Sequence, residues 1–192
     1  MIAKILLGSI IAILLGVLLY AVPATFSLPP GPRPEVEALT IEQAAQELND
    51  TGMTDWELVE AARAKVAERM LYSRRNSFDS VGRAFERGYG YCTQHAYALI
   101  SLLTELGFEA KVVQAFQNRF PDGVVTAHAW VSVRVNDESR YVDSLFYDEQ
   151  AGVLDFTPLS EVMEISPTFK LIAFWGGTAV NAHRYYVTGK DL

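Results

Sequence analysis

Cysteine, histidine and basic side chains are scarce in this chain of 192 residues. It holds one cysteine, three histidines, and 16 lysines and arginines against 23 acidic residues. One cysteine excludes an internal disulfide, and scattered histidines give no ligand spacing for a metal. The formal net charge of −7 argues against nucleic acid, whose phosphates demand a basic face. We expect no metal, no cofactor and no nucleic-acid partner.

Charge is missing altogether from the 18 residues 5–22, "ILLGSIIAILLGVLLYAV". As a helix they would extend about 27 Å, which is marginally enough for a bilayer core and longer than a typical secretory signal. We favour an uncleaved signal anchor over residues 1–24, although Val22-Pro23-Ala24 also suits a cleaved signal peptide. Lys4 precedes the run, so the positive-inside rule places the domain outside. The sequence thus predicts a single-pass membrane protein with an extracytoplasmic domain.

The rest of the chain reads as a proline-rich linker, residues 25–38, followed by one domain, residues 39–192. Thr40 is expected to cap a first helix, with Gln43 completing a capping box. Further helices are predicted from Asp55, over residues 77–87, and from Cys92 to a terminating glycine.

Strands are predicted after these helices, over residues 109–116, 128–135 and 140–146. Helices followed by an antiparallel sheet indicate an α+β fold. Near the C-terminus, "PLSEVMEI" is interpreted as a helix and "FKLIAFWGG" as a core segment.

The single cysteine stands in "GYGYCTQHAY", residues 88–97, at the start of a predicted helix. A lone cysteine in an exported protein indicates an intermolecular bridge or a reactive thiol, and unpaired amides at a helix start favour the thiolate. Gly88 and Gly90 would let the backbone turn sharply and a substrate approach. The alternative for Cys92 is a packing role in the core.

A nucleophilic thiol needs a base, and His128 is the candidate. It alternates with Ala129, Val131 and Val133, which form the core side of the strand, so His128 should face away from that core and be free to meet the cysteine helix. His95, one helical turn from Cys92, is a rival base that would point along its own helix.

Asp143 is the candidate carboxylate that orients the base. A two-residue turn at Asn136-Asp137 would put Asp143 opposite Trp130 and diagonal to His128, whereas a four-residue loop would separate the pair. The sequence therefore permits a Cys–His–Asp arrangement. Around it we predict substrate contacts from Tyr91 at the rim, Trp130 as a wall and Gln94 holding an amide.

Three ordered stretches carry a family resemblance: residues 80–113 ("SVGRAFERGYGYCTQHAYALISLLTELGFEAKVV"), then "HAWVSV", then "RYVDS". They resemble the transglutaminase-like superfamily of papain-like folds. The resemblance implies Cys92 as nucleophile, His128 as base and Asp143 as the orienting residue. Ser144-Leu145 replaces the family's usual Pro-Thr, and His95 stands where an aromatic residue is common.

These observations predict a membrane-anchored, extracytoplasmic thiol enzyme acting on amide bonds of proteins or peptides. A thioester acyl-enzyme would pass to water, giving proteolysis or deamidation, or to an amine, giving cross-linking; the sequence leaves these outcomes open. The alternative is a catalytically inactive transglutaminase-like module that binds envelope proteins or peptides.

Overall fold

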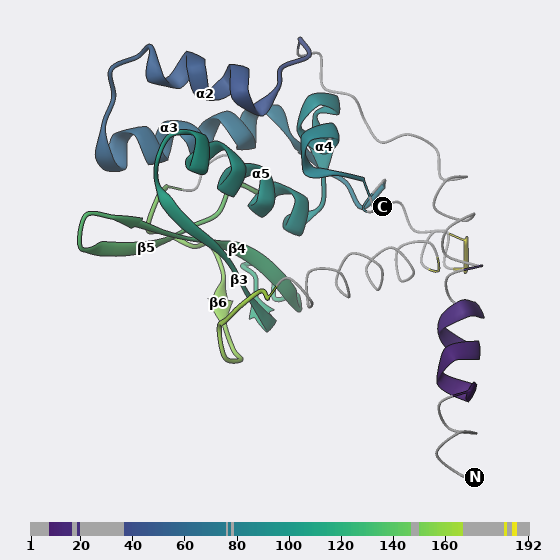
Figure 1. Cartoon of the computed structure of the whole chain (residues 1–192). Helices are drawn as coiled ribbons and strands as arrows, with labels where there is room; N and C mark the ends of the chain where they lie inside the picture. The colour runs from purple at the N-terminus through teal and green to yellow at the C-terminus, as the bar shows by residue number, and fades with distance from the viewer. Residues whose placement is uncertain are drawn as a thin grey trace.

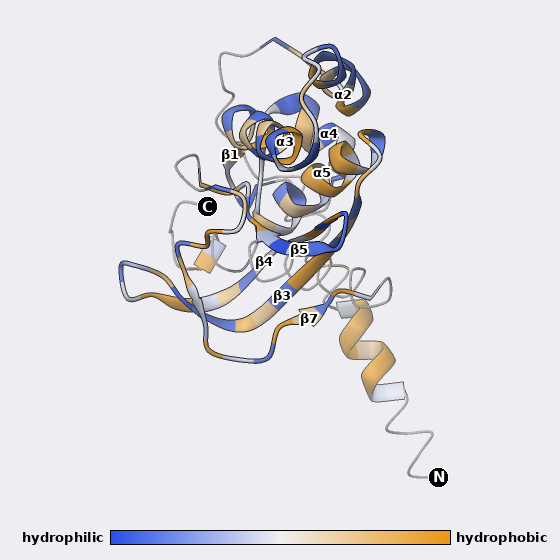
Figure 2. Ribbon diagram, turned by 90° about the vertical axis from the view of Figure 1, so that its left-hand side faces the viewer, coloured by the Kyte–Doolittle hydropathy of each residue, from blue (hydrophilic) through white to orange (hydrophobic). Residues whose placement is uncertain are grey.

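The computed structural model describes residues 8–16, 19, 37–75, 77, 79–146, 150–166, 183 and 186–187. Residues 8–16 form an exposed helix of hydrophobic side chains (Figure 2). No helix within the described ranges is both long and apolar enough to cross a membrane. Much of the predicted anchor, most of the linker and all of "FKLIAFWGG" lie outside the described residues.

Within the described residues from 37 onward, four helices precede the main sheet: α2 (Ile41–Asn49), α3 (Asp55–Arg69), α4 (Val81–Arg87) and α5 (Cys92–Glu105). The capping box of α2 is confirmed, because the Gln43 amide donates to Thr40 Oγ1 at 3.2 Å and the Thr40 amide donates to Gln43 Oε1 at 2.8 Å. The N-cap of α3 is Thr54, one residue before the predicted cap Asp55. The N-cap of α4 is Ser80, so this helix begins later than the predicted residue 77.

The main sheet is built on a long antiparallel pair, β3 (Glu109–Arg119) and β4 (Val125–Val135), with β5 (Glu138–Val142) on the far side of β4. The connection between β3 and β4 is only residues 120–124, shorter than predicted. Two short strands, β6 (Thr157–Pro158) and β7 (Met163–Glu164), pair with β3. The predicted helix in "PLSEVMEI" is therefore wrong.

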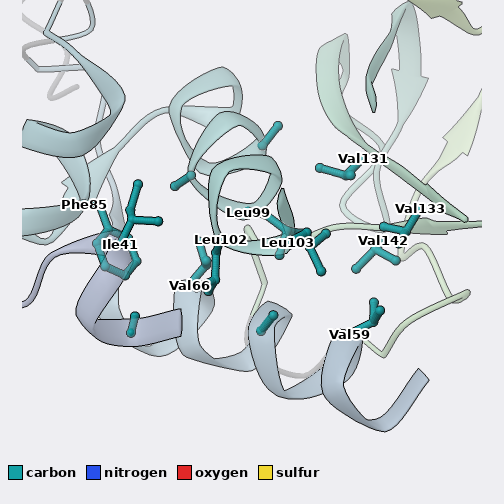
Figure 3. Packing of buried hydrophobic residues seen from close by; sticks show 14 of the residues in the cluster. Ile41, Val59, Val66, Phe85, Leu99, Leu102, Leu103, Val131, Val133 and Val142 are labelled. Carbon is teal, nitrogen blue, oxygen red and sulfur yellow. The ribbon is translucent and has the colours of Figure 1, made fainter. Parts of the chain in front are cut away.

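The helices cover one face of this sheet (Figure 1). Leu99, Leu102 and Leu103 of α5 are fully buried in one cluster with Val131 and Val133 of β4 (Figure 3). The alternation in β4 thus directs its odd-numbered side chains toward α5, as the sequence indicated. This layer fixes the long axis of α5 against the strand that carries His128.

The opposite face of the sheet is buried as well. A second cluster joins Val113, Ala115, Trp130 and Phe156, and residues 154–162 pack over it. His128 lies on this covered face with only 4% of its surface exposed. His128 therefore lies, as predicted, on the face opposite Val131 and Val133. The prediction that this face is free was wrong, because residues 154–162 cover it while α5 packs on the other face.

Candidate active site

Two short strands position the start of α5. β1 (Leu71–Tyr72) and β2 (Tyr89–Gly90) pair in parallel, and Gly90 lies immediately before the first turn. A Cβ atom on Gly90 would lie 2.9 Å from both Gln94 Cβ and Met70 Cε. Gly88 ends α4 with a φ of +81°. Gly88 thus provides the predicted turn as a left-handed cap, and Gly90 allows close packing at the entry to α5. Neither glycine lines the pocket described below, and the approach of a substrate to them stays a prediction.

The Cys92 thiol meets β4 at an edge that β5 leaves open. The His128 side chain and the Ala129 backbone both act on Sγ and lower its pKa, and Sγ lies 4.0 Å from Thr93 Oγ1. Val135 and Glu138 pair across a two-residue turn between β4 and β5. Such a closing pair is hydrogen-bonded, and hydrogen-bonded pairs recur at every second residue, so the backbone amides of odd-numbered β4 residues point toward β5. Because β5 ends at Val142, the Ala129 amide is available to the thiol. The first turn of α5 thus reaches His128 around the sheet edge.

Asp143 lies where the two-residue turn predicted it. The register Val131–Val142 places Asp143 beside Trp130, one residue beyond the end of β5. Its Oδ2 lies 2.5 Å from His128 Nε2, and its Oδ1 accepts a hydrogen bond from the Leu145 amide at 2.9 Å. Since Nε2 faces the carboxylate, Nδ1 is left to face the thiol.

Aromatic rings hold the His128 imidazole in this orientation. Phe120 and Phe156 contact it edge-on, with ring centroids 5.4 and 4.9 Å away, and Trp130 stacks beside it at 6.1 Å. The His128 and Asp143 side chains are each 3% exposed. Water is therefore largely excluded from the imidazole–carboxylate contact, which strengthens its electrostatics.

The electrostatics of the pair favour charge separation. Burial raises the pKa of the Cys92 thiol, but the hydrogen bond and charge of His128, with the Ala129 backbone and the Thr93 side chain, outweigh burial and lower it. Burial lowers the pKa of His128, but Asp143 and then Cys92 outweigh it and raise the pKa to about 10. Thiolate and imidazolium stabilise each other in this arrangement.

His95 is turned away from the thiol. Its Nδ1 lies 3.2 Å from the Ser144 carbonyl oxygen, and burial lowers the pKa of its ring. A neutral imidazole donates from Nδ1 to that carbonyl, and Ser144 Oγ donates back to the His95 carbonyl at 3.5 Å. Arg63 also donates to the Phe146 carbonyl at 3.0 Å. These contacts hold the segment after Asp143 against the helices.

A pocket of about 360 Å³ opens over the thiol, lined by Tyr72, Arg74, Cys92, Phe120, Thr126, Ala127, His128, Leu145 and Phe146. Four parts of the chain supply this lining. They are β1 with the nearby Arg74, the start of α5, the β3–β4 connection with the start of β4, and the segment after Asp143. These segments are distant in sequence and have no periodic pattern. Sequence reasoning therefore missed Phe120, Phe146 and Arg74.

The three predicted substrate contacts lie outside this lining. Gln94 is fully buried, where its Oε1 accepts from the Tyr91 amide and its Nε2 donates to the Asp79 carbonyl, both at 3.3 Å. Trp130 is fully buried beside His128, and Tyr91 is 8% exposed. The predicted substrate contacts of these three residues therefore stay predictions, and none of the three lines the pocket. Across the described ranges, no three His, Cys, Asp or Glu residues gather to hold a metal ion.

A thiol at the start of a central helix, opposed by a strand histidine, defines a cysteine protease-like α+β domain. The sequence model of the transglutaminase-like superfamily matches residues 42–144, more than half of the chain. The protein therefore belongs to the transglutaminase-like superfamily. No curated protein matches the chain.

Several solved structures are similar. A TGase crystal structure is 18% identical, over 57% of this chain and 31% of its own length, with a TM-score of 0.45. A candidate cysteine protease of Cytophaga hutchinsonii is 13% identical over 64% of this chain and 44% of its own, with a TM-score of 0.39. LapG of Legionella pneumophila is 13% identical over 77% of this chain and 99% of its own, with a TM-score of 0.42. The chain thus spans about a third of the TGase.

Proposed function

We propose that this protein is a thiol enzyme that acts on amide bonds of proteins or peptides through Cys92, His128 and Asp143. The observation that carries the proposal is that Cys92 and His128 line the same pocket, with 2.5 Å between His128 Nε2 and Asp143 Oδ2. The influence of His128 on the pKa of the thiol supports it. A nucleophile, a base and an orienting group in contact are the requirements for acyl transfer.

The chemistry follows from the charge-separated pair. The Cys92 thiolate attacks the amide carbonyl carbon, and backbone amides at the start of α5, including that of Cys92, stabilise the oxyanion. His128 gives the Nδ1 proton to the leaving nitrogen as the carbon–nitrogen bond breaks, which leaves a thioester. His128 then takes a proton from water or an incoming amine, and that nucleophile displaces the thiolate.

The test is a peptide panel incubated with the full-length protein and with Cys92→Ser. Mass spectrometry would score new termini for proteolysis, conversion of glutamine to glutamate for deamidation, and amine incorporation for transfer. We expect one of these products with the parent protein and none with Cys92→Ser. Binding of peptides without any product would instead favour the inactive binding module.

The proposal also includes the location of the protein in the cell. We propose a single-pass anchor in residues 1–24 and an extracytoplasmic domain. The support is the uncharged run of residues 5–22 and the position of Lys4 before it. Peptide segments of envelope proteins would then be the accessible substrates.

A further inference from the structure

The first half of β4 has an open edge beside the thiol. Pairing between β4 and β5 ends at Val131–Val142, so residues 125–130 have no neighbouring strand on that side within the described chain. The alternation that directs odd-numbered residues toward β5 directs the backbone groups of Val125 and Ala127 toward the open side. Among the described residues, no backbone group is hydrogen-bonded to them there. The amides and carbonyls of both residues are therefore available to another chain.

This edge also lacks the features that normally protect the edge of a sheet. Charged side chains, proline or a covering segment prevent exposed backbone groups from pairing with other chains. The outer edge of β5 has two of these features, because Glu138 and Arg140 are charged and the Gly152 amide donates to the Tyr141 carbonyl at 2.8 Å. Residues 125–127, Val-Thr-Ala, are uncharged and exposed. This part of β4 is thus suited to pairing with an added strand.

The pocket connects the open edge to the thiol. Thr126 and Ala127 line it together with Cys92. Ala129, whose backbone acts on the thiol, lies two residues beyond Ala127 in the same strand. Because a strand rises about 3.3 Å per residue, a segment paired with Ala127 would bring groups about 7 Å further along beside the sulfur.

The dimensions of the pocket favour a single extended segment as its occupant. The volume is about 360 Å³, and the lining includes Phe120 from the β3–β4 connection and Leu145 and Phe146 from the segment after β5. A volume near the lower limit for small-molecule sites admits a short stretch of peptide. It leaves no room for the whole sheet of a second copy of this chain.

We propose that the substrate is an extended peptide segment that pairs with Val125 and Ala127 as an added strand, next to the amide on which Cys92 acts. Backbone hydrogen bonds supply the affinity, and alternate side chains of the segment adjust it. Unfolded segments of proteins are the preferred substrates, because a helix uses its backbone groups internally. The inference rests on the proposed function for the reactive amide, whereas strand pairing itself requires no chemistry.

Hydrogen exchange tests the pairing without any reaction. The full-length chain with Cys92→Ala would be mixed with a saturating pool of acetylated and amidated octapeptides, whose positions hold alanine, valine, leucine, glutamine or lysine at random. We expect the Val125 and Ala127 amides to exchange about fivefold or more slowly with the pool, the scale of one hydrogen bond. The outward amide of Ser139 on β5 is the matched control, and its exchange should not change.

Methylation of the peptide backbone shows whether the contact is a strand pairing. A chloroacetyl group on a central diaminopropionate would alkylate Cys92 of the parent chain with loss of chloride, and mass spectrometry would give the rate. Methylating every second flanking amide removes the donors that face β4, so we expect labelling to slow about fivefold or more. Methylating the intervening amides should change the rate by less than about twofold, because only alternate amides face the neighbouring strand.

A proline variant removes a donor from the protein side. Proline is tolerated where an amide of an edge strand points outward. Ala127→Pro should slow the unmethylated peptide probe about fivefold, while iodoacetamide labels Cys92 at the parent rate. Ser139→Pro is the matched control at the outer edge of β5, and both of its rates should equal those of the parent chain.

Unchanged exchange at Val125 and Ala127 would overturn the inference, as would equal effects of methylating the alternate and the intervening amides. Failure of the proposed function has a different signature. The pool would then protect the edge in the Cys92→Ala chain, while the parent chain formed no product from peptides with a central glutamine. Product formation without protection of the edge would leave the proposed function standing and refute the inference alone.

Discussion

At the scale of residues, the pKa of the Cys92 thiol is set by opposing effects of its surroundings. A helix start contributes only about 0.3–1 kcal/mol to an anion, and burial raises the pKa of the thiol. The hydrogen bond and charge of His128 are the largest effects against burial, and together with the Ala129 backbone and the Thr93 side chain they lower the pKa of the thiol. The ionisation of Cys92 therefore depends on β4 more than on α5.

Asp143→Asn should shift the pH dependence of thiol reactivity. Loss of the carboxylate lowers the pKa of His128, so the imidazolium no longer favours the thiolate and the thiol pKa rises. We expect alkylation by iodoacetamide at pH 6 to slow about tenfold or more, the effect of one pKa unit, with little change above pH 9. Asp137→Asn, at a fully exposed carboxylate, is the matched control. Equal rates for both variants at pH 6 would contradict the role of Asp143.

His95 is predicted to position Asp143 without exchanging protons with the thiol. His95→Leu removes the donor to the Ser144 carbonyl, so we expect slower alkylation at pH 6 and a lower kcat, with KM little changed. In His95→Asn the amide nitrogen replaces Nδ1, and this variant should recover most of the rate. Without that recovery, His95 would not act through this hydrogen bond, and its possible role as the base would need testing again.

At the scale of elements, the entry to α5 depends on the absence of a side chain at Gly90. Gly90→Ala would force a methyl group against Gln94 and Met70, each 2.9 Å from the new atom. We expect a loss of about 1–3 kcal/mol in the free energy of unfolding, and slower thiol alkylation as the first turn shifts. Gly82→Ala is the control: no atom lies within 4 Å of its Cβ, and alanine favours the helix by up to about 1 kcal/mol. A thermal melt in which both variants match the parent protein would refute this packing argument.

Local patterns were enough to predict the elements that bring the site together. A helix start at Cys92 and strict alternation in β4 follow from short stretches. The register of Asp143 was left open between a two-residue and a four-residue connection, and the structure has the two-residue turn. That turn is formed with φ of +52° at Asn136, which asparagine tolerates better than most residues.

Strand pairing between segments distant in sequence determines the features that local patterns did not predict. "PLSEVMEI" has a helical spacing of apolar residues, yet two-residue pairings with β3 draw it into the sheet. The chain there covers the His128 face, so His128 is buried and Trp130 supports it from the side instead of lining the pocket. The burial of Gln94 was also not predictable from a short stretch, because its hydrogen bonds with Tyr91 and Asp79 form inside the fold.

At the scale of the whole molecule, both faces of the sheet are covered, and the site opens at one edge of β4. A buried imidazole between aromatic rings makes His128 a poor position for truncation, since alanine would leave a cavity. Cys92→Ser changes little volume at a half-buried position and is the better test of catalysis.

The proposed anchor makes a prediction about topology. Protease added to intact spheroplasts should digest the domain from Arg33 onward, because Lys4 favours a cytosolic location for the residues before the uncharged run. Immunoblotting with an antibody against the domain provides the measurement, and a cytosolic protein provides the control for membrane integrity. Full protection of the domain in intact spheroplasts would refute the proposed orientation.

The central claim is that Cys92 is held as a thiolate by His128, and alkylation of the native full-length protein tests it most directly. Iodoacetamide would be applied from pH 5 to pH 10, and modification of Cys92 would be quantified by mass spectrometry in folded and urea-unfolded protein. The account predicts that the folded thiol still reacts at pH 6 to 7, faster than the unfolded thiol, and slows as pH falls through its lowered pKa. A folded thiol that reacts only after unfolding, or whose rate rises only near the ordinary thiol pKa of about 8.5, would contradict it.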